Sequence, residues 1–129
     1  LTAAYSYTRA EYLVVDGRQR GDRRENLPEH QASAWATKGF DLGGDLSAKV
    51  GAGVRYQSDK VSFDQTYRIA PVTLVDAMIE LGYQDWTLSV NGANIFDKKV
   101  YTNCSFGGDE GYCYLGKDRT IMASLRRKF

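Results

Sequence analysis

Residues 119–129 read RTIMASLRRKF and end the chain on an aromatic side chain. In an extended strand, one face would carry Ile121, Ala123, Leu125 and Phe129, and the other face would carry Thr120, Met122, Ser124, Arg126 and Lys128. Soluble domains seldom stop inside a strand with an aromatic residue on its apolar side. A membrane-spanning β-barrel does, because its last strand crosses the bilayer and pairs with its first strand. The ending therefore predicts a strand of a transmembrane barrel wall.

Residues 46–56 give the clearest strand pattern in the chain. One face would hold Leu46, Ala48, Val50, Ala52, Val54 and Tyr56, with small or polar residues between them. A helix would instead place Lys49 and Gly53 beside Leu46, so a period of two is favoured. The length matches the ~9–11 residues of a tilted membrane strand. The same alternation predicts five more strands, at 1–15, 30–40, 73–83, 86–96 and 119–129, and in 30–40 the apolar face is ambiguous between the alanines and Trp35.

The connections between these predicted strands alternate in length. Short turns fall at 41–45 and 84–85, and long polar loops fall at 16–29, 57–70 and 97–118. Short turns at one end and long loops at the other are typical of outer-membrane barrels, with the long loops outside the cell. We therefore expect an all-β chain of six antiparallel transmembrane strands. Tyr83, Trp86 and Phe129 would then form part of the aromatic girdle on the periplasmic side.

Overall composition does not separate this prediction from a soluble domain. The net charge is +1, 43% of residues are hydrophobic and the mean hydropathy is −0.46, values that barrels share because half of each strand faces a polar lumen. A secreted β-sandwich binding module is therefore the alternative, although its strands are usually about five or six residues long. The chain opens in strand sequence without an initiator Met, so we expect a fragment that cannot close a barrel alone.

The sequence offers no constellation for enzyme catalysis. There is a single histidine, and no serine–histidine–aspartate spacing or phosphate-binding glycine loop. Asp76 and Glu80 share a predicted strand face, which is explained by lumen charges opposite Lys49 or Arg55. The first long loop carries four arginines among three acids between residues 16 and 25. This loop could contact lipopolysaccharide phosphates or could simply be solvated, and without interleaved aromatics it does not indicate nucleic-acid binding.

Three motifs resemble the TonB-dependent outer-membrane receptors. Residues 91–101 (NGANIFDKKVY) resemble the family signature near the barrel end, residues 67–77 (YRIAPVTLVDA) resemble an earlier strand, and residues 26–30 (NLPEH) with Trp35 resemble the segment that leads into another strand. The resemblance implies a 22-stranded barrel with an N-terminal plug. Residues 1–129 would be its last six strands, and contact with the TonB complex would run through the plug, which lies outside this sequence.

Cys104 and Cys113 lie close together in a glycine-rich stretch. Such a pair fits a disulfide formed in an oxidising compartment. A zinc site is the alternative, but the single histidine, His30, is far away in sequence, so we expect no metal site. The surrounding loop resembles the last extracellular loop of ferric-hydroxamate receptors, of the ferrichrome and ferrioxamine type. Arg127 departs from that family, which usually has an apolar or aromatic residue at the outward position.

The resemblance implies an outer-membrane receptor that takes up a ferric siderophore, with outer-membrane lipid around it and no cofactor of its own. A siderophore already surrounds its iron with oxygen ligands, so the receptor has to recognise an organic shell, for which aromatic side chains are well suited. The candidate ligand-binding residues are Phe106, Tyr112, Tyr114 and Tyr67. The alternative for each is that the ring only packs its loop. A passive or structural barrel is the alternative for the whole protein.

Overall fold

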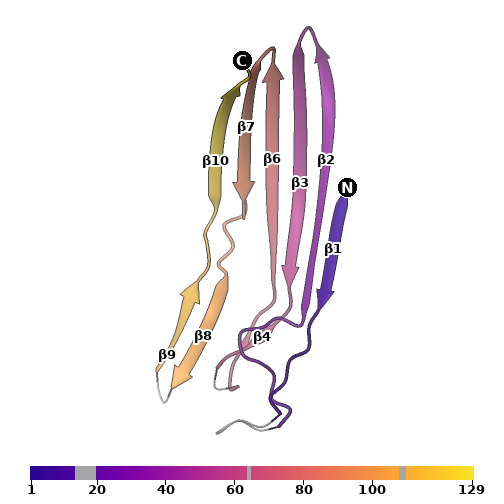
Figure 1. Ribbon diagram of the computed structural model, residues 1–129. Coiled ribbons are helices and arrows are strands. Elements are labelled where there is room, and N and C mark those ends of the chain that lie inside the picture. The colour runs from indigo at the N-terminus through magenta and orange to yellow at the C-terminus, as the bar shows by residue number, and fades with distance from the viewer. Residues whose placement is uncertain (14–19, 64, 108–109) are drawn as a thin grey trace.

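The computed structural model describes residues 1–13, 20–63, 65–107 and 110–129, and is built from antiparallel strands (Figure 1). In chain order the strands are β1 (Thr2–Tyr7), β2 (His30–Gly43), β3 (Leu46–Gln57), β4 (Lys60–Val61), β5 (Arg68–Ile69), β6 (Val72–Tyr83), β7 (Trp86–Ala93), β8 (Tyr101–Gly107), β9 (Glu110–Leu115) and β10 (Thr120–Arg127). Six of them form one open sheet in the order β1-β2-β3-β6-β7-β10. No helix in the described residues is long and apolar enough to cross a membrane.

The six-stranded sheet is a single layer with one apolar face. Its pairing places Val50 opposite Ile79 and Ile79 opposite Val90, and places Leu88 opposite Leu125. These side chains have no second layer over them: the exposed fractions of Leu46, Val50 and Val54 are 37%, 39% and 40%. The predicted six-stranded wall is confirmed, and the β-sandwich alternative is wrong, because a sandwich would bury this face against a second sheet.

Trp35 resolves the ambiguity in the second strand, β2. The alanines of β2 share the apolar face, since Ala34 pairs with Val54 and Ala36 pairs with Ala52. Trp35 lies on the polar face, where its ring covers Gly53, its partner on β3, and the nearby Gly51. A Cβ built on Gly51 would lie 2.9 Å from Trp35 Cζ2, and one built on Gly53 would overlap the same ring. The sheet therefore keeps a large aromatic ring on its polar side by placing two glycines beneath it.

The first strand is shorter than its sequence pattern predicts. We expected residues 1–15, but β1 ends at Tyr7. Beyond it the chain leaves the sheet and pairs with the returning part of its own loop, since the Thr8 N–H donates to the Glu29 carbonyl at 2.8 Å and Glu11 forms a bridge with Arg23. The pairing with β2 ends where Tyr7 meets His30, the first residue of β2, and pairing decides where a strand ends.

The fifth wall strand, β7, stops at Ala93 rather than at residue 96. Asn94 and Asp97 both adopt positive φ, 52° and 53°, which ends the extended conformation. Asn94 is 3% exposed and holds the turn from both sides: its side-chain amide donates to the Lys98 carbonyl, and its Oδ1 accepts the Lys98 N–H. The Asn94–Lys98 turn is thus a closed unit at the end of the wall, inside the motif at residues 91–101.

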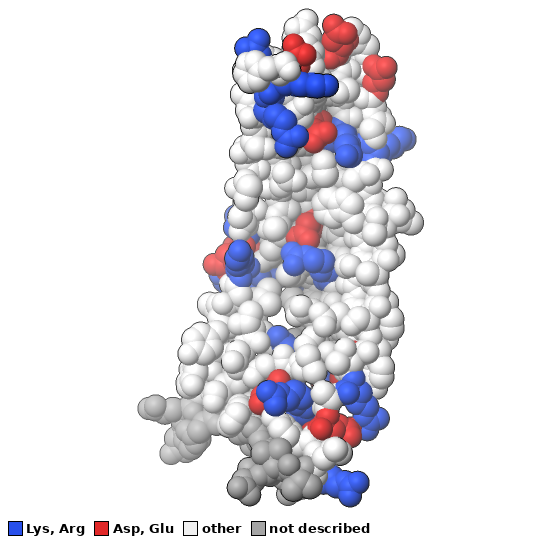
Figure 2. Space-filling view, in the orientation of Figure 1, with Lys and Arg blue, Asp and Glu red and all other residues white. Residues whose placement is uncertain are grey.

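Two of the long loops contain hairpins that the sequence analysis described only as loops. β4 pairs with β5, and β8 pairs with β9. Both hairpins lie at the end of the sheet away from the two short turns (Figure 1). Figure 2 shows charged side chains gathered towards the two ends of the molecule, with one small group between them and largely uncharged surface elsewhere in this view. The chain thus has a wall and, at one end, a cap of paired loops.

Candidate functional site

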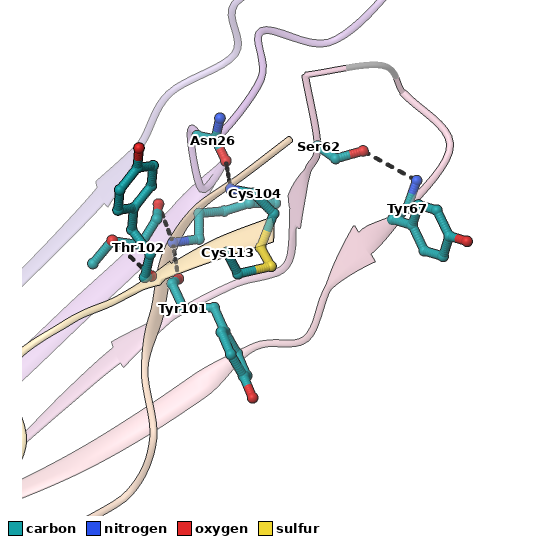
Figure 3. Close-up of a disulfide and its surroundings, with 9 residues drawn as sticks. Asn26, Ser62, Tyr67, Tyr101, Thr102, Cys104 and Cys113 are labelled. Atoms are coloured by element: carbon teal, nitrogen blue, oxygen red, sulfur yellow. Dashed lines mark hydrogen bonds between the residues drawn. A yellow bond between two sulfur atoms is a disulfide. The ribbon is translucent and has the colours of Figure 1, made fainter. Parts of the chain in front are cut away.

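The loops at the hairpin end are bonded to one another through Asn26. Its Oδ1 accepts the Cys104 N–H at 3.1 Å, and its own N–H donates to the Val61 carbonyl at 2.8 Å. The Phe63 N–H in turn donates to the Cys104 carbonyl at 3.3 Å. Figure 3 shows Asn26 reaching from the first loop to the disulfide hairpin. One residue of the first loop therefore links it to the second loop through its backbone and to the third loop through its side chain.

Lys60 lies inside this loop assembly, with 6% of its surface exposed. Its ammonium donates to the carbonyls of Tyr101 and Thr102, at 2.9 and 3.3 Å, and so joins β4 to β8. Burial lowers the pKa of Lys60, because the charged form loses hydration. Small apolar side chains surround the junction: Val61 is 5% exposed, and Ile69 is 8% exposed. The loops thus have a small core of their own.

Charged pairs bind the first and second loops further. Arg23 pairs with Glu29 and with Asp59, both at 3.1 Å, and Arg68 reaches the same Asp59 carboxylate at 3.0 Å. Gln65 adds an amide hydrogen bond to the Arg23 carbonyl at 2.9 Å. Pairs at this degree of exposure contribute little individually. As a network they fix how the two loops lie against each other.

The predicted disulfide between Cys104 and Cys113 is present. The two residues lie directly opposite each other on β8 and β9, and Cys104 is 2% exposed. Figure 3 shows the bond between the strands, beside Asn26 and Thr102. The bridge therefore fastens the hairpin at the same place where Asn26 ties it to the rest of the loop assembly.

Two of the four candidate ligand-binding residues lie side by side on the outside of this hairpin. Tyr112 and Tyr114 are 61% and 62% exposed, and their rings meet edge to face with centroids 5.7 Å apart. Tyr67 lies on the β4–β5 loop, 55% exposed, where its N–H donates to Ser62 Oγ at 3.1 Å. Phe106 pairs through its backbone with residue 111 on β9, but its side chain lies outside the described residues. The structure thus brings Tyr112 and Tyr114 together.

Sequence reasoning missed Phe63, whose side chain is 54% exposed. Phe63 and Tyr112 line the same shallow depression, together with Arg24, Glu25, Asn26, Asn103 and Ser105. Its residues come from all three long loops. A second aromatic residue in the loop at 57–70, beside Tyr67, was the available signal, but nothing in the sequence indicated which other loop it would face.

A larger groove runs along the polar face of the sheet, with a volume of about 580 Å³. Its polar lining includes Ser6, Gln31, Ser33, Arg55, Gln57, Lys117 and Asp118. Arg55 binds the Asp76 carboxylate with two hydrogen bonds, of 2.6 and 2.8 Å, as expected for a lumen charge pair. The backbone N–H of Asn94 also donates to Asp76, at 2.8 Å. In the described part of the chain, no three histidine, cysteine or acidic side chains are grouped to hold a metal ion.

Comparison with known proteins shows which protein family this six-stranded sheet belongs to. Residues 1–95 match the family model described as "TonB dependent receptor-like, beta-barrel". The chain belongs to the TonB-dependent receptor family. The matched residues contain β1 to β7, and so cover five of the six wall strands.

The curated relatives of this TonB-dependent receptor chain are named receptors and transporters. It is 31% identical over its whole length to the ferrioxamine B receptor of Salmonella typhimurium (strain SL1344), and 32% identical over 98% of its length to the ferrioxamine receptor of Yersinia enterocolitica. It is 26% identical over its whole length to the ferrichrome outer membrane transporter/phage receptor of Escherichia coli (strain K12). The chain spans 18% or 19% of the length of these relatives.

Membership of this family indicates the environment of each face and each end of the sheet. The chain is part of the β-barrel of a TonB-dependent receptor, which lies in the bacterial outer membrane, and its relatives are named as receptors and transporters. In such a barrel the short turns lie on the periplasmic side and the long loops outside the cell. The apolar face then meets lipid, the polar groove lies on the lumen side, and the hairpins with Tyr112 and Tyr114 face the external medium.

Proposed function

We propose that this chain forms the C-terminal wall and the last external loops of a receptor for TonB-dependent uptake of a ferric siderophore, most consistent with the hydroxamate type. The observation that carries the proposal is the disulfide-closed hairpin, which presents the edge-to-face pair Tyr112 and Tyr114 to the outside. The names of the ferrioxamine and ferrichrome relatives support the ligand class. The plug and the remaining strands would come from the rest of the receptor.

The proposed chemistry is recognition of an organic shell. A ferric siderophore presents chelating oxygens and an apolar backbone, and a tyrosine offers an apolar ring and a hydroxyl to such a surface. We assign this role to Tyr112 and Tyr114, with Tyr67 and Phe106 as further contacts. The loop hydrogen bonds through Asn26 and the disulfide hold the hairpin before the ligand arrives, which lowers the ordering cost of binding.

The remaining partners follow from the same proposal. The siderophore would pass along the lumen side of the wall after rearrangement of the plug, driven by the TonB complex. Outer-membrane lipid would cover the apolar face. Lipopolysaccharide phosphates are the proposed partners of the arginines in the first long loop, and residues 16–19 of that loop lie outside the described residues.

A tyrosine truncation in the intact receptor tests the ligand site. Replacing Tyr114 with Ala removes an exposed anchor ring, so ferric-hydroxamate affinity should fall by about 1–3 kcal/mol, the value of a large apolar contact. The measurement is equilibrium binding to purified receptor by fluorescence quenching. Tyr83→Ala is the matched control, because Tyr83 lies 53% exposed beside the short turn at the other end of the wall.

Two results would count against the proposal. Unchanged affinity in Tyr114→Ala and Tyr112→Ala would remove both tyrosines from the site. Intact receptor that binds no ferric siderophore, or that passes it equally well in cells without TonB, would favour the passive barrel.

A further inference from the structure

Two cations lie on the lipid-facing side of the wall. Lys38 pairs in register with Val50, and Arg127 pairs with Trp86, so both side chains project from the apolar face. The other charged residues of the described wall strands alternate onto the polar face, as Lys49 does opposite Glu80. A charge facing lipid is costly at the bilayer midplane and much less so near the interface. The energetic cost of these two charges therefore depends on the depth in the bilayer that each charged group occupies.

Arg127 is held between two aromatic rings. Its guanidinium carbon lies 5.3 Å from the centroid of Trp86 and 5.2 Å from that of Phe129. Trp86 follows the short turn, at the periplasmic end of the wall, where aromatic residues mark the membrane interface. Among the described residues, no carboxylate forms an ion pair with Arg127. The guanidinium is thus positioned at headgroup depth with its N–H donors unclaimed by an acid.

Lys38, which lies on β2, has a similar arrangement on a second strand of the sheet. Its ammonium lies 5.2 Å from the centroid of Phe40, which is two residues nearer to the short turn. The lysine stem therefore runs along the wall towards the periplasmic side, in the way that lysines on membrane surfaces reach for the interface. Within the described ranges no carboxylate pairs with Lys38 either. Two independent strands thus present a cation on an aromatic ring towards the same rim.

We infer that Arg127 and Lys38 bind the phosphates of glycerophospholipids in the periplasmic leaflet. A phosphate diester accepts the charge-assisted hydrogen bonds that an unpaired guanidinium or ammonium can donate. The aromatic rings hold both cations towards the periplasmic rim: Arg127 lies level with Trp86, and Lys38, which lies further in at the level of Val50, reaches towards the rim over Phe40. The acyl chains would cover the neighbouring apolar face, for example Leu125 and Leu88. This inference requires the membrane wall but not the siderophore site.

Charge-matched variants on opposite faces test the inference in the intact receptor. Arg127→Gln should weaken binding of phosphatidylglycerol about fivefold, the effect of one cation near a membrane surface. Arg126→Gln is the control, because Arg126 is the adjacent arginine on the polar face, opposite Thr87. Lys38→Gln and Lys49→Gln form a second pair of the same design. Native mass spectrometry of detergent-solubilised receptor measures each affinity, and diacylglycerol with the same chains reports the apolar contribution.

The expected pattern is a loss in both apolar-face variants and none in the two controls. Equal losses in Arg126→Gln and Arg127→Gln would overturn the inference, as would equal affinity for diacylglycerol and phosphatidylglycerol. If soluble glycerol phosphate bound as well as the lipid, the site would be one for a free anion, and the lipid assignment would be wrong. Arg127→Lys, which keeps the charge, should retain most of the binding. An unchanged melting temperature in each variant shows that the barrel is intact.

Discussion

Gly51 and Gly53 give Trp35 the room to lie flat on the lumen side of β3. A Cβ on Gly53 would overlap the indole, and one on Gly51 would also meet Met78 Cγ at 2.7 Å. Glycine normally weakens a strand, because it has no side chain to pack. Here the missing side chains make space for a ring that covers the β2–β3 ladder. The two glycines are therefore part of the packing of the wall.

A methyl group at residue 53 should destabilise the wall. Gly53→Ala drives a Cβ into the Trp35 ring, and overpacking of this kind costs about 1–3 kcal/mol. Gly39→Ala is the control, because nothing lies within 4 Å of a Cβ at that strand position. Urea unfolding of the intact receptor in micelles measures both. If the two variants lost the same stability, or if Trp35→Ala failed to relieve the loss at residue 53, the ring would not be the cause.

Asp97 ties the Asn94–Lys98 turn to the start of the last strand. Its Oδ1 accepts the backbone N–H of Arg119 at 2.8 Å. That hydrogen bond, with the positive charges of Lys99 and Arg119, lowers the pKa of Asp97 below its ordinary value of 3.8. Because the folded pKa is the lower one, the carboxylate stabilises the turn above the unfolded pKa, and this contribution is lost as the pH falls through the folded pKa.

The stability difference between the native receptor and Asp97→Asn should therefore depend on pH. It should be constant between about pH 5 and 7 and should shrink as the pH drops below about 3.8, because the unfolded state then takes up a proton; it is lost once the pH lies below the folded pKa, where Asp97 is neutral. Hydrogen exchange at the Arg119 amide, followed against pH, measures the local opening. A difference that stayed the same down to pH 2 would show that the charge of Asp97 does not act on this bond.

The β8–β9 hairpin is the element that carries the proposed site, and its disulfide closes it. A closed loop with a sequence separation of 9 is stabilised by about 2.6 kcal/mol on the chain-entropy estimate. The bonds from Asn26 and Lys60 hold β8 on its other side. The bridge thus restricts β9 in particular, and β9 is the strand that bears Tyr112 and Tyr114.

Removing the bridge should loosen the hairpin and weaken ligand capture. In a Cys104→Ala, Cys113→Ala double variant, amides of β9 should exchange faster, and siderophore affinity should fall because the tyrosines must then be ordered on binding. Hydrogen exchange with mass spectrometry measures the first effect, and titration measures the second. The wall strands β3 and β6 serve as the internal reference, and their protection should not change. Unaltered exchange in β9 would show that Asn26 and Lys60 suffice to hold the hairpin.

Element by element, the wall could be predicted from the sequence because its pattern is set by lipid on one face. The strand at 46–56 appears as β3 with one additional residue, and that at 73–83 appears as β6. The ends of strands were less predictable. Tyr7 ends β1 because the chain beyond it pairs within its own loop, and a pairing partner is not visible in a local pattern.

The loop hairpins escaped prediction for a related reason. β4 and β5 are two residues each, too short to show alternation, and their burial depends on Asn26 and Cys104 from other loops. The disulfide of the hairpin could be inferred from the spacing of the cysteines and the glycine content, whereas the ligand-binding role of Tyr112 and Tyr114 stays a prediction, for which the structure adds that both rings are exposed. The contribution of Phe63 could not be inferred, since it depends on contact between loops.

At the scale of the whole molecule, a single sheet has two different surroundings. Its lipid face is largely uniform, so the sequence there needs mainly small or aliphatic side chains, with aromatic residues and Arg127 at the rim and Lys38 directed towards it. Its lumen face holds the ion pair of Arg55 and Asp76 and the Trp35 ring. The external end is a third setting, in which three loops share one small core. The outer strands β1 and β10 are open edges of this sheet, where the rest of a barrel wall would pair.

The hydrogen bonds of Asn26 have a consequence for how such a receptor can change its ligand. The side chain of Asn26 joins the first loop to the third, and the backbone of Asn26 joins the first loop to the second. The position of each loop therefore depends on the other two. Grafting a single loop from a relative would leave Cys104 and Val61 without their matching partners. Exchange of specificity by recombination or by engineering therefore has to transfer the three segments as a set, and a loop on its own is not a portable module.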